Sequence, residues 1–120
     1  MNDFVGLLFH SRTQAHIFHL QTTSFAKHLA LQEYYEGIVP LIDGLVEAYQ
    51  GKYGLLTDYR MNIATKDLTS DDEVTNYFTA LSKVVEAKRA GLPQDNFLQN
   101  VYDDVETLIH STNYKLRFLS

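Results

Sequence analysis

Histidines and carboxylic acids recur at helical spacing between residues 16 and 47, and their side chains could bind a metal ion. Imidazole nitrogens and carboxylate oxygens are the ligands that suit iron, manganese and zinc. His16 and His19 are three residues apart and Asp43 and Glu47 are four apart, so each pair shares one face of a helix. The sequence therefore supplies the donor atoms of a metal site in two separate groups.

The second group extends along one predicted helix. With about 100° per residue, five polar residues fall within an arc of roughly 100° that borders the apolar face, namely His28, Gln32, Glu36, Asp43 and Glu47. A polar strip in this position lies at a seam between helices or between subunits. Its charges need partners there, because burying an unpaired carboxylate costs several kcal/mol.

Three interpretations of these residues stay open. In the first, a metal ion is bound by His16, His19, His28, Glu36, Asp43 and Glu47, with Arg12 and Gln32 supporting the ligands. In the second, the same residues form only ion pairs and hydrogen bonds along the seam, and Arg12 neutralises a carboxylate. In the third, Arg12, His16 and His19 bind an anion such as phosphate, because Arg and charged His both donate hydrogen bonds to oxyanions.

The composition argues against several other classes of protein. The chain has no cysteine, which excludes disulfides, thiolate zinc sites and a cysteine nucleophile. Its net charge of -5 and the lack of a basic tail argue against a nucleic-acid partner. No apolar run approaches the roughly 18 residues that span a bilayer, and the N-terminus lacks the basic leader of a signal peptide. We therefore expect a cytoplasmic protein with no membrane partner.

Four amphipathic helices would position these residues. The helical periodicity predicts helices over 3–21, 24–50 and 70–89, and a last helix that opens at Pro93. Ser24 or Thr23 is the predicted N-cap of the second helix and Gly51 its stop, and residues 70–73 have the spacing of a capping box. We predict an all-α protein with one domain over residues 1–120, folded as an up-down-up-down four-helix bundle.

Small and apolar residues point to a partner surface on the first two helices. Five small residues of the second helix share a narrow outer arc, namely Ala26, Ala30, Gly37, Gly44 and Ala48. Leu7, Ile17 and Phe18 of the first helix also point away from the predicted core. An exposed apolar face of this kind usually marks a partner surface, so we predict a homo-oligomer through these helices. The alternative is that the connection over residues 52–69 covers this face.

Residues 15–47, AHIFHLQTTSFAKHLALQEYYEGIVPLIDGLVE, resemble the ferritin-like Dps family, the iron-oxidising cage proteins of starved bacteria. In that family a first-helix histidine is followed by a second-helix histidine, and then by an aspartate and a glutamate four residues apart. His28, Asp43 and Glu47 match the second-helix part, whereas His16 fits the first histidine by spacing and His19 fits it by the polar residues that follow. The resemblance implies a ferritin-like bundle, with iron oxidised from ferrous to ferric at a site between two subunits.

The chain departs from the Dps pattern at two positions. The tryptophan that usually follows the first histidine is replaced by Ile17 or Leu20. The acid that usually lies four residues after the second histidine is Gln32, although Glu36 follows one turn later. The chain also lacks the basic tail that some Dps proteins use on DNA.

Nearly the whole chain is similar to a family of small proteins of large tailed bacteriophages, through the segments FHSRTQAH, EAYQGKYG and NVYDDVETLIHSTNYKL. This resemblance implies a phage-encoded protein in the host cytoplasm, and it does not imply any particular activity. The main functional hypothesis is a ferritin-like metal-binding protein that takes iron, with manganese or zinc as alternatives, and acts as a ferroxidase if it is an enzyme. The other hypothesis is a helical oligomeric interaction protein that binds a host protein or a small anionic ligand without metal.

Overall fold

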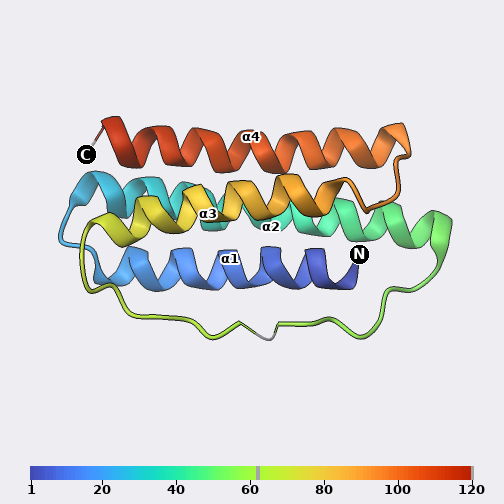
Figure 1. The fold of residues 1–120 in the computed structure, drawn as a ribbon, viewed down its shortest axis with the longest axis horizontal. Coiled ribbons are helices and arrows are strands. Elements are labelled where there is room, and N and C mark those ends of the chain that lie inside the picture. Colours follow the sequence, from blue (N-terminus) through green and yellow to red (C-terminus); the bar gives the residue numbers. More distant parts are fainter. Residues whose placement is uncertain (62, 120) are drawn as a thin grey trace.

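The computed structural model describes residues 1–61 and 63–119, and every regular element among them is an α-helix (Figure 1). The four helices are α1 (Asn2–Gln21), α2 (Phe25–Tyr53), α3 (Asp72–Arg89) and α4 (Asn96–Phe118). They lie along the longest dimension of a molecule that measures 44 × 25 × 22 Å. The prediction of an all-α four-helix bundle is confirmed.

The ends of α2 follow from two residues. Ser24 caps the helix as predicted, because its hydroxyl oxygen accepts a hydrogen bond from the backbone N–H of Lys27. Gly51 does not stop the helix, which continues for two more residues to Tyr53. The stop is Gly54, which has a φ of 95°, a conformation that costs glycine little because it has no Cβ.

The starts of α3 and α4 lie slightly later than predicted. The predicted capping box between Ser70 and Glu73 does not form at α3, because the Glu73 carboxylate instead accepts a hydrogen bond from the Thr69 backbone N–H. The helix accordingly begins at Asp72 rather than at residue 70. α4 begins at Asn96, three residues after the predicted first helical residue, Pro93.

The helices form two antiparallel hairpins, α1–α2 and α3–α4, joined by one long connection (Figure 1). This connection, residues 54–71, returns along the whole bundle, so α3 starts beside the end of α1 and runs parallel to α2. The order is up-down-down-up, which differs from the predicted alternation. An extended segment of this length reaches about 55–65 Å, so it can span a bundle of this size.

Ion pairs confirm the packing of α2 against α4. Lys52, near the end of α2, pairs with Asp95, which precedes α4. Glu33, near the start of α2, pairs with Lys115, near the end of α4. The two helices are therefore antiparallel neighbours.

The core is built from the apolar faces of all four helices. Its large, fully buried side chains include Phe4, Leu8, Phe18, Leu31, Tyr34, Ile38, Phe78 and Tyr102. Tyr34 keeps its polar group satisfied, because its hydroxyl lies 2.7 Å from the hydroxyl of buried Ser11, which itself donates to the Leu8 carbonyl. Burial raises the pKa of Tyr34, so its hydroxyl stays protonated.

Several expectations about the outer faces of α1 and α2 are wrong. Leu7 and Phe18 are buried rather than outward-facing. Ala30 is buried as well, and a side chain at Gly37 would lie 3.3 Å from Leu108 of α4. Part of the small-residue stripe therefore packs against α4, while a side chain at Gly44 would meet open space.

The connection over residues 54–71, which we call the strap, is fastened to α1 by side-chain amides. Gln14 donates from its amide nitrogen to the Lys66 carbonyl and accepts the Lys66 backbone N–H, both at 2.9 Å. Gln21 likewise accepts the backbone N–H of Leu68 at 2.7 Å. These amides supply hydrogen-bond partners that a neighbouring strand would otherwise provide.

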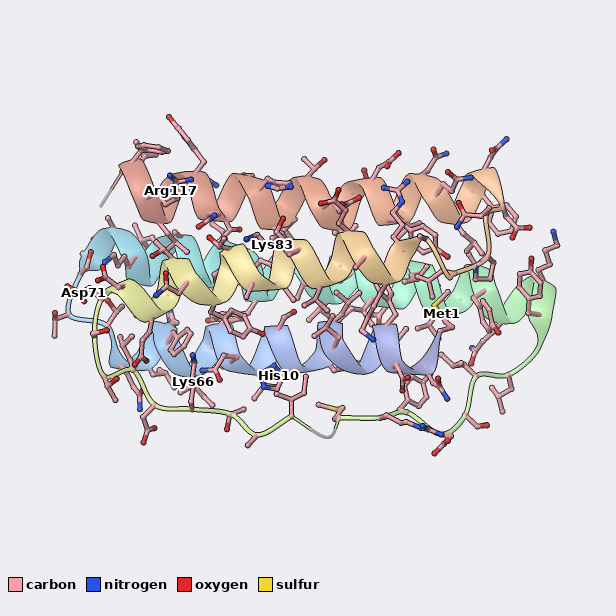
Figure 2. All side chains as sticks on the ribbon, viewed as in Figure 1. Met1, His10, Lys66, Asp71, Lys83 and Arg117 are labelled. Carbon is pink, nitrogen blue, oxygen red and sulfur yellow. The ribbon has the colours of Figure 1, made fainter. Side chains whose placement is uncertain are left out.

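Two further α1 residues fix the course of the strap. His10, on the side of α1 that faces the strap (Figure 2), donates from Nε2 to the Ala64 carbonyl at 3.1 Å. Its Nδ1 then accepts from the Tyr77 hydroxyl of α3, also at 3.1 Å. At Gly6 the strap passes so close that an added Cβ would lie 1.8 Å from the Arg60 carbonyl oxygen. Only glycine fits there.

Candidate metal centre

The α1–α2 hairpin brings three histidines together beside its turn, and we call His16, His19 and His28 the histidine cluster. The rings of His19 and His28 are stacked, with centroids 3.7 Å apart and an interplanar angle of 19°. The ring of His16 lies 5.9 Å from that of His19 and stacks on Tyr35 at 4.2 Å. The cluster arises because a turn of only three residues separates the two helices.

His19 and His28 hold each other through reciprocal hydrogen bonds. The Nδ1 of His19 lies 2.7 Å from the His28 carbonyl, and the Nδ1 of His28 lies 2.8 Å from the His19 carbonyl. A carbonyl oxygen only accepts, so both Nδ1 atoms carry a proton. In the neutral rings Nε2 then keeps its lone pair, and neither Nε2 makes a hydrogen bond within residues 1–61 and 63–119.

The surroundings of His16 favour its neutral form. Burial lowers the pKa of His16 below its ordinary value, and the nearby charge of Arg12 and the His19 ring lower it further. A neutral imidazole can donate its lone pair to a metal ion.

The predicted carboxylate ligands lie away from the histidine cluster. Glu36, Asp43 and Glu47 are all exposed on α2, and Glu36 accepts a hydrogen bond from the Gln32 amide at 3.0 Å. Asp43 follows His28 by fifteen residues, which is about 22 Å along a helix. Within the described part of the chain, no group of three or more histidines and acids is placed to hold one metal ion.

The structure therefore divides the predicted ligands into two sets. The three histidines come together, whereas the acids share a face of α2 without reaching them. His10, a buried histidine that joins α1, the strap and α3, was not among the predicted site residues. Its spacing was a usable signal, because Gly6, His10 and Gln14 follow one another at intervals of four and so share one helix face.

Comparison with known proteins identifies a family of unknown function. The model of a family of unknown function, DUF5856, matches residues 19–116, which is most of the chain. The chain belongs to this DUF5856 family. No curated protein and no solved structure matches it.

The match to the DUF5856 family covers both stacked histidines, His19 and His28, and all three predicted acids. His16 and Arg12 precede the matched region. None of the helices in residues 1–61 and 63–119 combines the length and hydropathy that a bilayer-crossing segment needs.

Proposed function

We propose that the protein binds a first-row transition metal at the histidine cluster, with iron as the first candidate and manganese or zinc as alternatives. One observation carries this proposal: His19 and His28 each donate Nδ1–H to a backbone carbonyl and keep Nε2 free. Metal-ligating histidines almost always have this second hydrogen bond, because it fixes the tautomer and the ring orientation. His16, whose pKa is lowered by burial, would supply a third nitrogen by turning from its stack on Tyr35 toward the other two rings.

The acids would complete this site from a second copy of the chain. Asp43 and Glu47 lie too far along α2 to reach His28 of their own chain. An antiparallel α2 of a second copy would bring its two acids beside the cluster, and the resemblance to Dps proteins favours this arrangement. The homo-oligomer would then form through α1 and α2, with Glu36 near its centre.

Two further features support a ferritin-like protein. A bundle with a single long crossover after the second helix has the connectivity of ferritin-like folds. Carboxylate ligands are hard oxygen donors and favour ferric over ferrous iron, so a site completed by acids could act as a ferroxidase. The resemblance to phage proteins favours the cytoplasm of a host cell as the location of such a protein.

Metal content tests the proposal. The protein is purified without chelator, loaded with ferrous iron, manganese or zinc, desalted, and measured by elemental analysis together with its mass in solution. We expect bound metal in the unmodified chain, loss of it in His28→Ala, and retention in the control His110→Ala, which replaces an exposed histidine of α4. No retained metal with any of the three ions would contradict the proposal. Oxygen uptake with ferrous iron separates an enzyme from a passive site.

The alternative function, an interaction protein without metal, is favoured by one surface feature. Leu20, Phe25 and Leu29 are 70%, 71% and 45% exposed beside the α1–α2 turn. Phe25 also lines a hollow of about 310 Å³, together with the turn residues and His28. Apolar side chains gathered in this way fit a partner protein, such as a host factor. A thermal-shift screen of anions and nucleotides tests the small-ligand form of this alternative, and no shift across the panel would count against it.

A further inference from the structure

A groove lies between α1, α3 and the strap, away from the histidine cluster. α1 and α3 approach each other less closely than the other neighbouring helices do. Leu7 of α1 and Leu81 of α3 form the floor of the gap, and both are buried. Ile63 of the strap and Val84 of α3 flank it and stay 54% and 40% exposed. Apolar side chains therefore line an accessible channel.

The groove consists of two hollows that share lining residues. The hollow that we call inner has a volume of about 140 Å³, is open to solvent and reaches His10 and Tyr77. The outer hollow has a volume of about 260 Å³ and opens beside Arg60 and Lys88. Three apolar residues line both hollows, namely Leu7, Ile63 and Val84. One elongated molecule can therefore occupy both.

The inner hollow suits an apolar group. Among the described residues its polar lining consists of His10 and Tyr77, which bond each other, and His10 also bonds the Ala64 carbonyl. A ligand therefore needs no polar atom at this end. An apolar cavity of about 150 Å³ in another protein holds benzene, so a ring or a chain of a few carbons matches this volume.

The outer hollow suits an anionic group. Lys88 makes no ion pair within residues 1–61 and 63–119. Asp3, which also lines the opening, lies 3.8 Å from Arg60, and Arg60 pairs more closely with Asp58, at 3.0 Å. Lys88 is therefore a basic residue at the mouth of the groove that no carboxylate of the described residues pairs.

We propose that this groove binds a small amphipathic anion, a carboxylate that carries a short aliphatic or aromatic group. The apolar group occupies the inner hollow beneath Ile63, and the carboxylate pairs with Lys88. This site is separate from the proposed metal centre, because its residues come from α1, the strap and α3.

Octanoate is the probe, measured by isothermal titration calorimetry and by NMR shifts of Ala80 and Val84. Octanol and octylamine have the same chain with a neutral and a cationic head. We expect saturable binding of octanoate, several-fold weaker binding of octanol, and the weakest binding of octylamine. Octanoate that does not bind, or that binds no better than octylamine, would overturn the proposal.

Matched variants locate the site. Val84→Phe fills the groove and should abolish octanoate binding, whereas Val39→Phe changes a valine of equal 40% exposure on α2 and should leave binding unchanged. Lys88→Glu should weaken octanoate binding about tenfold with little effect on octanol, and the control Lys83→Glu should change neither. Unaltered octanoate binding by Val84→Phe or by Lys88→Glu would contradict the assignment. All four positions are exposed, so these variants should fold.

Discussion

His16 is the member of the histidine cluster whose protonation its neighbours alter. Burial lowers its pKa, and the charge of Arg12 lowers it further. Arg12→Gln should therefore raise the pKa of His16 part of the way back toward 6.5, since burial remains. NMR titration of the imidazole protons measures this change, with Arg117→Gln on α4 as the control. A His16 pKa that is unchanged in Arg12→Gln would contradict the assigned cause.

The same lowered pKa links His16 to stability. Its folded-state pKa lies below the ordinary value of 6.5, so protonation favours the unfolded chain. The contribution of His16 is fully present above pH 6.5 and is lost as the pH falls below that value. Urea unfolding at pH 8 and pH 5.5 should show a smaller loss of stability in His16→Gln than in the unmodified protein. An equal loss would show that His16 does not contribute.

Ser11 and Tyr34 form a buried polar pair that can be removed in two ways. Ser11→Ala leaves the Tyr34 hydroxyl buried without its partner and should cost about 1–3 kcal/mol of unfolding free energy. Adding Tyr34→Phe removes the stranded hydroxyl, so the double variant should recover most of that loss. Urea unfolding measures all three variants. A double variant as unstable as the sum of the two single ones would contradict the pairing.

The passage of the strap over α1 depends on Gly6. Gly6→Ala would place a Cβ within 1.8 Å of the Arg60 carbonyl oxygen, so the strap must lift there. The backbone amides of Lys66 and Leu68 donate hydrogen bonds to the side chains of Gln14 and Gln21. In Gly6→Ala these two amides should exchange their hydrogens with solvent faster.

Gly44→Ala is the matched control for Gly6→Ala, because a side chain at Gly44 meets nothing within 4 Å. It should raise stability by about 0.5–1 kcal/mol through helix propensity and leave exchange in the strap unchanged. Amides of Lys66 and Leu68 that exchange as slowly in Gly6→Ala as in the unmodified chain would contradict this account of the strap.

The helices were predictable from sequence, whereas their directions were not. Helical periodicity and caps such as Ser24 are local, so the pattern predicts each element within a few residues. The direction of α3 depends on where the strap runs, and that course is fixed by Gln14 and Gln21, side chains about fifty residues away in sequence.

The candidate site shows the same limit at longer range. The histidines were predicted to come together, and they do, because a short turn joins their helices. Asp43 and Glu47 are separated from His28 by several helical turns. Spacing along one chain predicts which side chains share a helix face, and it does not predict contacts with a second chain.

The whole molecule consists of two hairpins held together by a common core and an exposed strap. Arg60 and Lys66 lie in the strap, outside any helix, so trypsin should cut there before it cuts in α3 or α4. The two large fragments, residues 1–60 and 67–120, should stay associated and helical, because the buried core joins all four helices. Mass spectrometry and circular dichroism after brief digestion test this. Early cuts at Lys83 or Arg117 would contradict it.

The hydrogen bonds that hold the strap against α1 affect how two copies of the chain can associate. Each hairpin is complete in itself, so the α3–α4 hairpin of one copy could pack on the α1–α2 hairpin of another and recreate the same core. Such domain swapping needs only that the hinge between the hairpins open. The bonds from His10, Gln14 and Gln21 to the strap tie the second hairpin to its own chain. These bonds should therefore favour a core formed within one chain over a core shared between two.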